Sequence, residues 1–449
     1  MSFKKFSALR LQEPEIQFYV GKHISPRRIV TYKPFSYRDL LNEEIHVKLL
    51  ADAETCDLGI QLVNHLINGC SVANESIRPF SEIFGAKIVF HKDNDVAKIS
   101  SENLLVKLEE TLDILRSEAS RGIAIIALKD IPSDIYANIK VKTLSEHPKS
   151  TRAQFIKKET IENNINSGGY VYLLLNIATA IYAKVGGIPW KLSRSIFPVK
   201  GLILGISFSK KCTKKSDKEV IYYGAVQILD EHGEHLYTEI KMFTASPKEL
   251  ETKGLFVPYD KLKDILINTI KQHGKIPQII IHKSAPIVDD EIKAVREVVK
   301  EYSSDEYPIF YIFAHIKTNT IYRAYDPSAS DYSIRRGLML LRSSKSSNWI
   351  QHILFTTGRL YKLASERDKL GTPKPLEIAV DTNMSDMSKL PNYIGEPVLA
   401  LTKLDWNTTD PEVRKPITIT YSRKAAQIAP RILSSQLPDL KVADIRSLM

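Results

Sequence analysis

The chain has 449 residues, with 63 lysines and arginines against 52 aspartates and glutamates, so its formal net charge is 63 − 52 = +11. At about 100–200 residues per domain, this length allows two to four domains. With 43% hydrophobic and 26% charged residues, the composition is globular and excludes a disordered chain. Three widely spaced cysteines exclude a disulfide framework or a cysteine zinc site.

The excess of basic residues is informative about the binding partners of the protein and not about its fold. Nucleic acid is a natural counterpart for it, and a solvated basic surface kept for solubility is the alternative. The longest apolar run, 170–183, is interrupted by Asn176 and Thr179 and is too short for a membrane span. The N-terminus has no apolar signal core. We therefore expect a cytoplasmic protein that is not inserted in a membrane.

The first half of the chain alternates strand-like and helix-like runs. The predicted strands cover 15–20, 27–32, 43–51, 86–91, 122–129 and 152–158. The predicted helices cover 55–69, 102–120, 133–144 and 169–185. Such alternation, with an apolar inner strand at 122–129, is typical of a parallel, doubly wound α/β sheet of the Rossmann-like kind.

The pattern changes after Trp190, where an antiparallel meander is predicted from strands at 201–209, 219–229 and 234–243. The elements predicted next are a helix at 247–273, a strand at 278–283, a helix at 289–302, strands at 308–317, 338–343 and 351–358, and a helix at 421–434. This order is that of a ribonuclease-H-like fold. The glycine stop at 186–187 places the domain boundary there, giving domains 1–185 and 186–449.

Several strings, taken in chain order, resemble prokaryotic Argonaute proteins of the short class. They are EPEIQFYVGKHISPRR (13–28), NIATAIYAKVGGIPWKL (176–192), GLILGISFS (201–209), IIIHKSAPIVDDEI (279–292), HILFTTG (352–358), GTPKPLEI (371–378), and ALTKLDWNTTD with PITITYSRKAA (400–426). The resemblance implies a MID domain at 1–185 with an N-terminal entry strand, and a PIWI domain at 186–449. The length leaves no room for N and PAZ domains.

In this family the MID domain holds the 5′-phosphate of a guide strand with a tyrosine, two lysines and a glutamine. The resemblance assigns these roles to Tyr136, Lys140, Gln154 and Lys184. Tyr136 and Lys140 are four residues apart, so they share one face of the predicted helix and can reach one anion together. Two ammonium groups and a phenol donor compensate the charge of a phosphate well.

The resemblance also implies a structural Mg²⁺ at the guide 5′-phosphate. Its ligands would be the carbonyl oxygen of Gln154 and the C-terminal carboxylate, which here is that of Met449. Oxygen ligands suit this ion. The tail DLKVADIRSLM (439–449) carries spaced apolar residues, a pattern that would dock it near the pocket.

Each of the four residues also has a structural interpretation that the sequence leaves open. Lys184 would be a last-turn cation favoured by the helix dipole, and Lys140 one of several solvated lysines. Tyr136 would belong to the core, and Gln154 would face water. Nearby cations that either steer a strand or form plain surface are Lys149, Arg152, Lys157 and Lys158.

Ribonuclease-H-type cleavage needs acidic residues that hold two metal ions about 4 Å apart. Active Argonautes supply Asp, Glu, Asp and then Asp or His, and the resemblance places Ser207, Ser284 and Arg423 at three of these positions. Neutral hydroxyls do not offset two dications, and a guanidinium has the wrong charge. We therefore predict a degenerate site, no catalytic residues and no enzyme activity.

Other polar residues keep two interpretations. The acids that would serve a displaced nuclease site are Asp230, Asp289, Asp290 and Asp326, although an acid pair at a helix start is typically an N-cap. The lysines that either grip duplex backbone or form a solvated hairpin tip are Lys210, Lys211, Lys214, Lys215 and Lys218.

In apolar strands, His282, His315 and His352 are expected to be hydrogen-bonded core residues.

The resemblance implies guide-dependent recognition, in which a 5′-phosphorylated guide RNA pairs with a complementary target DNA and the protein reads backbone shape. Short Argonautes typically pair with an effector protein that carries a PAZ-analogue domain. A heterodimer is therefore expected, with higher oligomers possible on activation, acting in immunity against phages or plasmids by abortive infection. Two alternatives stay open: a guide-dependent nuclease with displaced acids, and a non-guided single-strand-binding protein.

Overall fold

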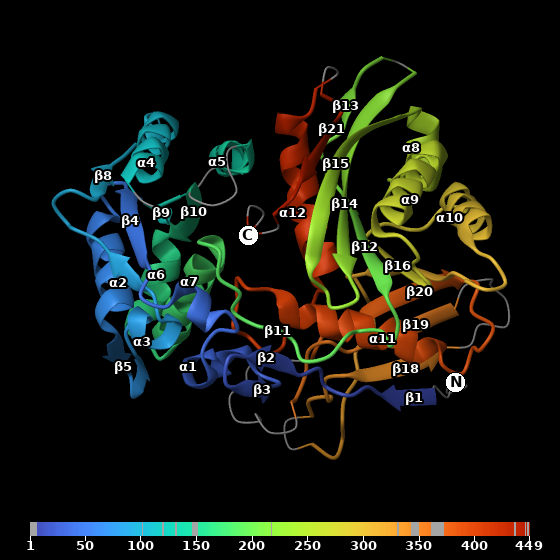
Figure 1. Cartoon of the computed structure of the whole chain (residues 1–449), viewed down its shortest axis with the longest axis horizontal. Helices are drawn as coiled ribbons and strands as arrows, with labels where there is room; N and C mark the ends of the chain where they lie inside the picture. The colour runs from blue at the N-terminus through green and yellow to red at the C-terminus, as the bar shows by residue number, and fades with distance from the viewer. Residues whose placement is uncertain are drawn as a thin grey trace. The chain divides into compact units, whose positions relative to one another are not determined.

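The computed structural model describes residues 7–449 apart from 101, 119–120, 131–132, 146–150, 217, 330–331, 343–349, 361–371, 435–436, 445 and 447–448. The chain forms two compact units (Figure 1). The first unit comprises Glu15–Ser193, Asp405–Pro411 and the tail from Asp444. The second unit comprises Arg194–Leu404, Glu412–Ala443 and the described residues before Glu15.

This division differs from the predicted domains 1–185 and 186–449, and strand pairing is the reason. Strand β1 (Ser7–Arg10) pairs with β18 (Leu338–Arg342), so the N-terminal strand belongs to the second unit. Strand β11 (Lys191–Leu192) pairs with β2 (Ile16–Phe18), which keeps the residues up to Ser193 in the first unit.

A parallel sheet forms the centre of the first unit, as predicted. Its order is β10-β9-β4-β7, with β8 beside β4. The strands are β4 (Glu44–Ala51), β7 (Lys87–Val89), β8 (Val96–Lys98), β9 (Gly122–Leu128) and β10 (Thr151–Lys157). The helices are α2 (Cys56–Asn68), α3 (Phe80–Phe84), α4 (Leu104–Glu118), α5 (Ser133–Ser145), α6 (Lys158–Ile165) and α7 (Gly169–Lys184). All seven residues of β9 are buried, as expected for an inner strand covered on both faces.

One predicted strand of this unit is wrong. Residues 27–32 form the turn η1 (Pro26–Arg28) and the single-turn helix α1 (Ile29–Tyr32). Proline at the first helical position fixes the backbone for a helical start, and this outweighs the strand propensity of the β-branched residues that follow. Helix α6 was not predicted. The remaining small elements are β3 (Gly21–His23), η2 (Tyr37–Leu40), β5 (Cys70–Val72) and β6 (Glu75–Ile77).

The second unit contains an eleven-stranded sheet in the described residues, in the order β1-β18-β19-β20-β17-β16-β12-β14-β15-β21, with β13 beside β14. The strands not yet given are β12 (Gly201–Phe208), β13 (Thr213–Lys214), β14 (Val220–Asp230), β15 (His235–Ala245), β16 (Gln278–Lys283), β17 (Phe310–Lys317), β19 (Ile350–Leu354), β20 (Leu376–Thr382) and β21 (Asp439–Val442). β12 is antiparallel to β14 and parallel to β16, and β17 continues in parallel. This is the predicted ribonuclease-H-like arrangement.

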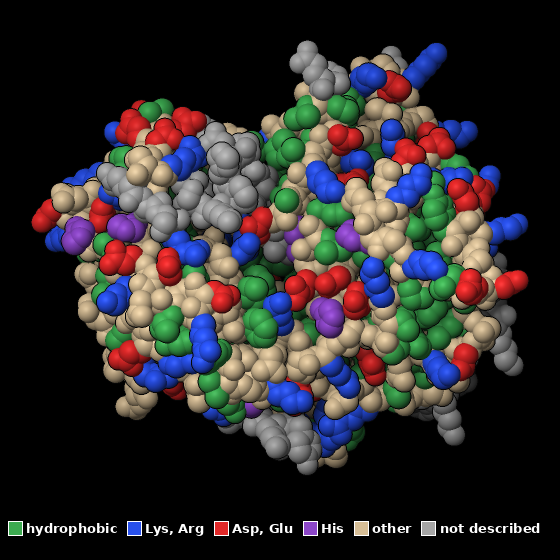
Figure 2. Space-filling model, in the orientation of Figure 1, with side chains coloured by type: hydrophobic (Ala, Val, Ile, Leu, Met, Phe, Trp, Pro, Cys, Tyr) green, Lys and Arg blue, Asp and Glu red, His purple; other side chains and the backbone are tan. Residues whose placement is uncertain are grey.

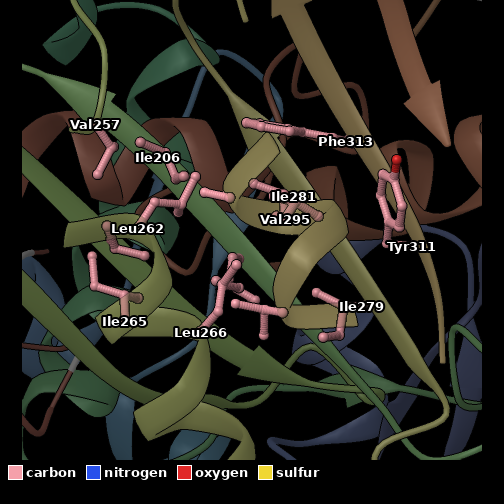
Figure 3. Packing of buried hydrophobic residues seen from close by; sticks show 14 of the residues in the cluster. Ile206, Val257, Leu262, Ile265, Leu266, Ile279, Ile281, Val295, Tyr311 and Phe313 are labelled. Atoms are coloured by element: carbon pink, nitrogen blue, oxygen red, sulfur yellow. The ribbon is translucent and has the colours of Figure 1, made fainter. Parts of the chain in front are cut away.

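Helices pack against this sheet. They are α8 (Pro247–Lys253), α9 (Tyr259–His273), α10 (Asp289–Tyr302), α11 (Leu390–Leu401) and α12 (Ile417–Ile432), and the turn η3 (Thr402–Leu404) follows α11. Figure 3 shows Ile206, Ile281 and Phe313 of the sheet packed with Leu262 of α9 and Val295 of α10. Strand side chains alternate between faces, so Ser207 and His282 lie on the other face, where they contact α12.

The single helix predicted at 247–273 is two helices. Gly254 has a φ of 72°, which ends α8, and Pro258 precedes α9 as its N-cap. The last helix begins at Ile417 rather than 421, because Pro416 provides its N-cap. Strand β20 and helix α11 were not predicted. Within the part of the chain that is described, no helix has both the length and the apolar character that a membrane crossing requires.

Candidate nucleic-acid interface

On the face shown in Figure 2, lysine and arginine side chains are interspersed with acidic ones. The net charge of +11 therefore marks no single site on this face, and binding sites have to be located from local geometry. Two places decide the interpretation: the ends of α5, β10 and α7 in the first unit, and the contact of β12 with α12 in the second.

Helix α5 and strand β10 bring the first two predicted residues together. The ammonium of Lys140 lies 5.7 Å from the centre of the Tyr136 ring, and that ring lies 4.9 Å from the ring of Phe155 on β10. Lys140 is only 5% exposed, so it is not the solvated lysine of the structural interpretation. Burial raises the pKa of the Tyr136 phenol, which keeps it protonated and able to donate a hydrogen bond.

Helix α7 places Lys184, 4% exposed, at its last residue. The Lys184 ammonium donates to the main-chain oxygen of Ala153 at 2.9 Å and to Oε1 of Gln154 at 2.6 Å. Gln154 thus presents its carbonyl oxygen to a cation, and its amide donates to the main-chain oxygen of Phe155. All four predicted residues therefore lie on or beside β10, where Tyr136 packs on Phe155 and Lys184 binds Gln154.

The tail of the chain reaches the same region. The Lys140 ammonium donates to the main-chain oxygen of Met449, which is buried. The predicted proximity of Met449 to the pocket is therefore found. Of the predicted apolar tail residues, Leu440 and Val442 lie in β21 and pair with β15 in the second unit, whereas 445 and 448 lie outside the described residues.

Three further cations lie here, of which only Arg152 was named from the sequence, as a residue that steers a strand or forms plain surface. Arg152 is 5% exposed, so it is not plain surface, and it binds the Asp444 carboxylate at 2.7 Å. Arg446 Nε binds the same carboxylate at 2.8 Å. Burial alone would raise the pKa of Asp444, but the hydrogen bond from Arg446 and the charge of Arg152 outweigh it and lower that pKa. Arg121 donates to the main-chain oxygen of Val185, next to Lys184.

These contacts describe a cationic cluster, which we define as Lys140, Arg152, Lys184 and Arg446 with Arg121 beside it. Arg152 lies two residues before Gln154 on β10, so alternation along a strand puts both side chains on one face. That spacing was the available sequence signal for Arg152. The cluster holds four cations against the one carboxylate of Asp444 in a mostly buried setting, where electrostatic interactions with an anion are strong.

The predicted slicer positions lie in the second unit. Ser207 on β12 is fully buried, and the Ser422 hydroxyl of α12 donates to its Oγ at 2.8 Å. Ser284 follows β16 and its main-chain N–H donates to Ile206 O at 2.9 Å, so it adjoins Ser207. The side chain that reaches Ser207 is Ser422, whereas the predicted Arg423 is the next residue and is half-buried. The neutral hydroxyl of Ser422 therefore meets Ser207, one of the positions that the resemblance assigned to a metal-binding acid.

Close packing of α12 on the sheet explains this contact. A Cβ at Gly205 would lie 2.8 Å from the carbonyl carbon of Thr418, so only glycine lets the helix approach. The Thr418 hydroxyl also hydrogen-bonds Nδ1 of His282 at 3.0 Å. Burial lowers the pKa of His282 to about 3, so its ring is neutral. His282 is the hydrogen-bonded core residue that was predicted.

The other two histidines differ. His352 is buried, but neither ring nitrogen has a hydrogen-bond partner among the described residues, so the prediction of a hydrogen-bonded ring is wrong there. Its strand neighbour across the sheet is the apolar Ile378, which offers no polar group. Burial lowers the pKa of both His315 and His352 to about 4.

The acids of the displaced-site alternative have local partners. Asp230 Oδ1 accepts the main-chain N–H groups of His232 and Glu234, which closes the turn between β14 and β15. Asp290 binds Lys253 at 2.9 Å. The N-cap of α10 is Val288, so Asp289 and Asp290 lie in its first turn rather than at its cap. Among the described residues, no group of three His, Cys, Asp or Glu is placed to hold a metal ion.

The lysine loop forms the hairpin around β13. Its five lysines are exposed, and Lys215 pairs with Glu219 at 2.9 Å. Both interpretations of this loop, a grip on duplex backbone and a solvated tip, therefore stay predictions.

A parallel α/β unit with a cationic cluster, joined to a ribonuclease-H-like unit, defines a class of nucleic-acid-handling proteins. The chain matches the Piwi domain family over residues 123–433, and it belongs to this family as an Argonaute-type protein. It is 22% identical over 278 residues to the protein argonaute of Cereibacter sphaeroides, covering 59% of this chain and 34% of that protein.

Solved structures show the same fold. The Argonaute of Clostridium butyricum, bound to a guide DNA and a 19-mer target DNA, matches 94% of this chain with a TM-score of 0.63 and 18% identity. The A. aeolicus Argonaute matches 97% of it with a TM-score of 0.62 and 16% identity. The chain spans about a third of the curated relative and covers 52% and 55% of these two solved chains.

Proposed function

We propose that this chain binds the 5′-phosphate of a guide RNA in the cationic cluster and uses the guide to recognise a complementary DNA target. The observation that carries the proposal is the arrangement of Tyr136, Lys140 and Lys184 around strand β10, with both lysines buried and with Arg152 on the same strand. A phosphate group suits this arrangement, because it is negatively charged and has several oxygens that accept hydrogen bonds from ammonium, guanidinium and phenol groups. The Clostridium butyricum relative was solved with a guide DNA and a target DNA, which supports a guide and a target strand as partners but not the choice of RNA for the guide.

We also propose that the chain does not cut its target. The support is the buried contact between Ser207 and Ser422, which leaves hydroxyls where two metal ions would need carboxylates. A non-cutting chain passes its signal on, so we propose an effector protein with a PAZ-analogue domain as partner, in cytoplasmic immunity against phages or plasmids. Incubation with a guide-matched target and Mg²⁺ or Mn²⁺ should give no product. Cleavage that disappears in Asp289→Ala/Asp290→Ala would overturn this part.

Mg²⁺ is a separate part of the proposal. Gln154 Oε1 and the main-chain oxygen of Met449 are oxygen donors of the kind the ion prefers, and bound Mg²⁺ would neutralise phosphate charge. Each of these oxygens already accepts a hydrogen bond from a lysine ammonium. The ion would have to replace those bonds, so we propose Mg²⁺ as an auxiliary. Chelation with EDTA should weaken guide binding less than about 10-fold.

Competition between otherwise identical strands with a 5′-phosphate and a 5′-hydroxyl tests the proposed function. Hydrogen bonds to charged groups are worth about 1.5–3 kcal/mol each, so two or more should give at least about 100-fold preference for the phosphate. Tyr136→Phe, which removes only the phenol donor, should reduce the preference several-fold. Equal affinities in the wild-type protein would favour the non-guided single-strand binder instead.

A further inference from the structure

The three most exposed large hydrophobic side chains of the described residues lie close together in sequence. Ile321 is 90% exposed, Tyr325 63% and Tyr332 61%, all in the segment that joins β17 to β18. Exposed aromatic residues gathered in this way mark interaction sites rather than ordinary surface. No role assigned above uses this segment, apart from Asp326 as a candidate acid.

Two residues of this segment pack against the interior of the second unit. Tyr322 and Ala324 pack against a small buried cluster of Ile334, Ile353 and Phe355. The residues between and beside them, Ile321, Arg323 and Tyr325, are exposed. The alternation places an isoleucine, an arginine and a tyrosine in one outward row, which we call the Tyr–Arg row together with Tyr332.

A closed turn holds the second tyrosine near the first. The Asp326 N–H donates to Tyr332 O at 3.1 Å, and Asp326 Oδ1 accepts the N–H of Ser328 at 3.0 Å. The carboxylate also lies 3.7 Å from Arg359. Asp326 is thus a turn-forming residue rather than a catalytic acid. Tyr332 has a φ of 53°, a left-handed conformation that is uncommon and strained for a bulky residue and that concentrates at functional sites.

The chemistry of the Tyr–Arg row suits a single-stranded nucleic acid. Within the described part of the chain, the rings of Tyr325 and Tyr332 contact neither another aromatic ring nor a cation, so their faces are open. Nucleobases stack on such faces, and arginine binds the phosphates between them. In residues 317–336, Lys317, Arg323 and Arg335 stand against Asp326 and Asp331, because Arg336 is buried in an ion pair with Glu13 and is not available to a ligand. Arg323 is exposed, and its Nη1 donates to the main-chain oxygens of Thr320 and Tyr322, which holds the guanidinium at the segment. The remaining excess of cations favours an anionic ligand.

We propose that the Tyr–Arg row is a second nucleic-acid site, where bases stack on Tyr325 and Tyr332 and Arg323 binds the backbone. The site goes beyond the proposed function because it recognises the interior of a single strand and needs no strand end. A protein partner is the other class that tyrosine and arginine serve, and the test below separates the two.

A circular oligothymidylate is the probe, because it has no 5′ end for the cationic cluster. Stacking is worth enough per base that Tyr325→Ala and Tyr332→Ala should each weaken binding at least about 5-fold, with the dependence on salt unchanged. Arg323→Ala should reduce the slope of log affinity against log salt by about 0.7, as expected for one phosphate contact on a single strand. All three residues are exposed, so the variants should fold normally.

The matched control is Tyr307→Ala. Tyr307 is 45% exposed, but Lys275 covers its ring at 3.3 Å, so this change should alter the affinity less than 2-fold. Unchanged affinity for the circle in Tyr325→Ala/Tyr332→Ala, or no binding of the circle by the wild type, overturns the proposal and leaves the row to a protein partner. The preference for a 5′-phosphate should survive in these variants. If the wild-type protein shows no preference for a 5′-phosphate, that result would contradict the proposed function and leave the proposal for the Tyr–Arg row untouched.

Discussion

The cationic cluster of the first unit and the serine contact of the second differ in the polar groups that they bury, which are charged in the cluster and neutral in the serine contact. Near β10, two lysines and an arginine are buried among oxygen acceptors. Near β12, the buried groups are the neutral hydroxyls of Ser207 and Ser422, which are joined by one hydrogen bond. Burying a charge costs several kcal/mol unless it is well compensated, whereas a paired hydroxyl costs little. The costly arrangement marks the region where we propose that an anion binds, and the less costly one is a helix packing contact.

Breaking the buried ion pair of the cluster should have the largest effect. Arg152→Met removes one of the two cations that bind Asp444 and leaves the pair with Arg446, so we expect a loss of about 1.5–3 kcal/mol in the free energy of unfolding, as for one hydrogen bond to a charged group. Lys107→Met is the matched control, because the pair of Lys107 with Glu110 is exposed and should be worth less than about 1 kcal/mol. Urea unfolding measures both, and equal losses would contradict the account.

The same pair predicts a dependence on pH. The pKa of Asp444 is lower in the fold than in the unfolded chain, so its stabilisation is present above the unfolded pKa and is lost as pH falls through the folded one. Below about pH 4, the difference in stability between wild type and Asp444→Asn should therefore shrink. A difference that stays constant down to pH 2 would show that the charge is unimportant.

The serine contact predicts a steric effect of intermediate size. In Gly205→Ala, the new Cβ would clash with the Thr418 backbone of α12, and overpacking of this kind costs about 1–3 kcal/mol. Gly201→Ala, on the same strand, meets the Phe197 ring at 3.1 Å and a backbone oxygen at 3.3 Å and should cost less. Thermal unfolding compares the two, and a larger loss at Gly201 would argue against close docking of α12.

The smallest expected effect on stability concerns His282, which hydrogen-bonds Thr418 of α12. Because its ring is neutral in the fold with a pKa of about 3, its NMR signals should not titrate between pH 5 and 8. The stability it contributes is present above the unfolded pKa, near 6.5, and declines as pH falls below that value. Thr418→Val removes its hydrogen bond and should cost about 1 kcal/mol. Titration near pH 6.5 would mean that the ring is solvated.

Much of the fold was predictable from local patterns. Apolar runs of strand length identified β9 and β16, and helical periodicity identified α4 and α10 within a few residues. The spacing of Tyr136 and Lys140 placed them on one turn of α5, where the structure has them. These features depend on neighbours in sequence, which a single sequence displays.

What failed depends on contacts between distant residues or on backbone details. Arg152 and Asp444 are far apart in the chain, and nothing local marks them as partners. Residues 27–32 have strand propensity, yet Pro26 turns them into helix. The choice between Ser422 and Arg423 as the side chain facing Ser207 depends on the rotation of α12, which close packing at Gly205 fixes.

The measurement that tests the central claim most directly is the ratio of affinities for 5′-phosphate and 5′-hydroxyl strands in Lys140→Met/Lys184→Met. Methionine keeps the buried volume and removes the charge, so the account predicts that the wild-type preference of at least about 100-fold falls to within about 3-fold of unity. Lys87→Met/Lys98→Met removes the same charge from exposed positions of the first unit and should keep the preference. A double variant at Lys140 and Lys184 that folds and still prefers the phosphate as strongly as the wild type would contradict the account.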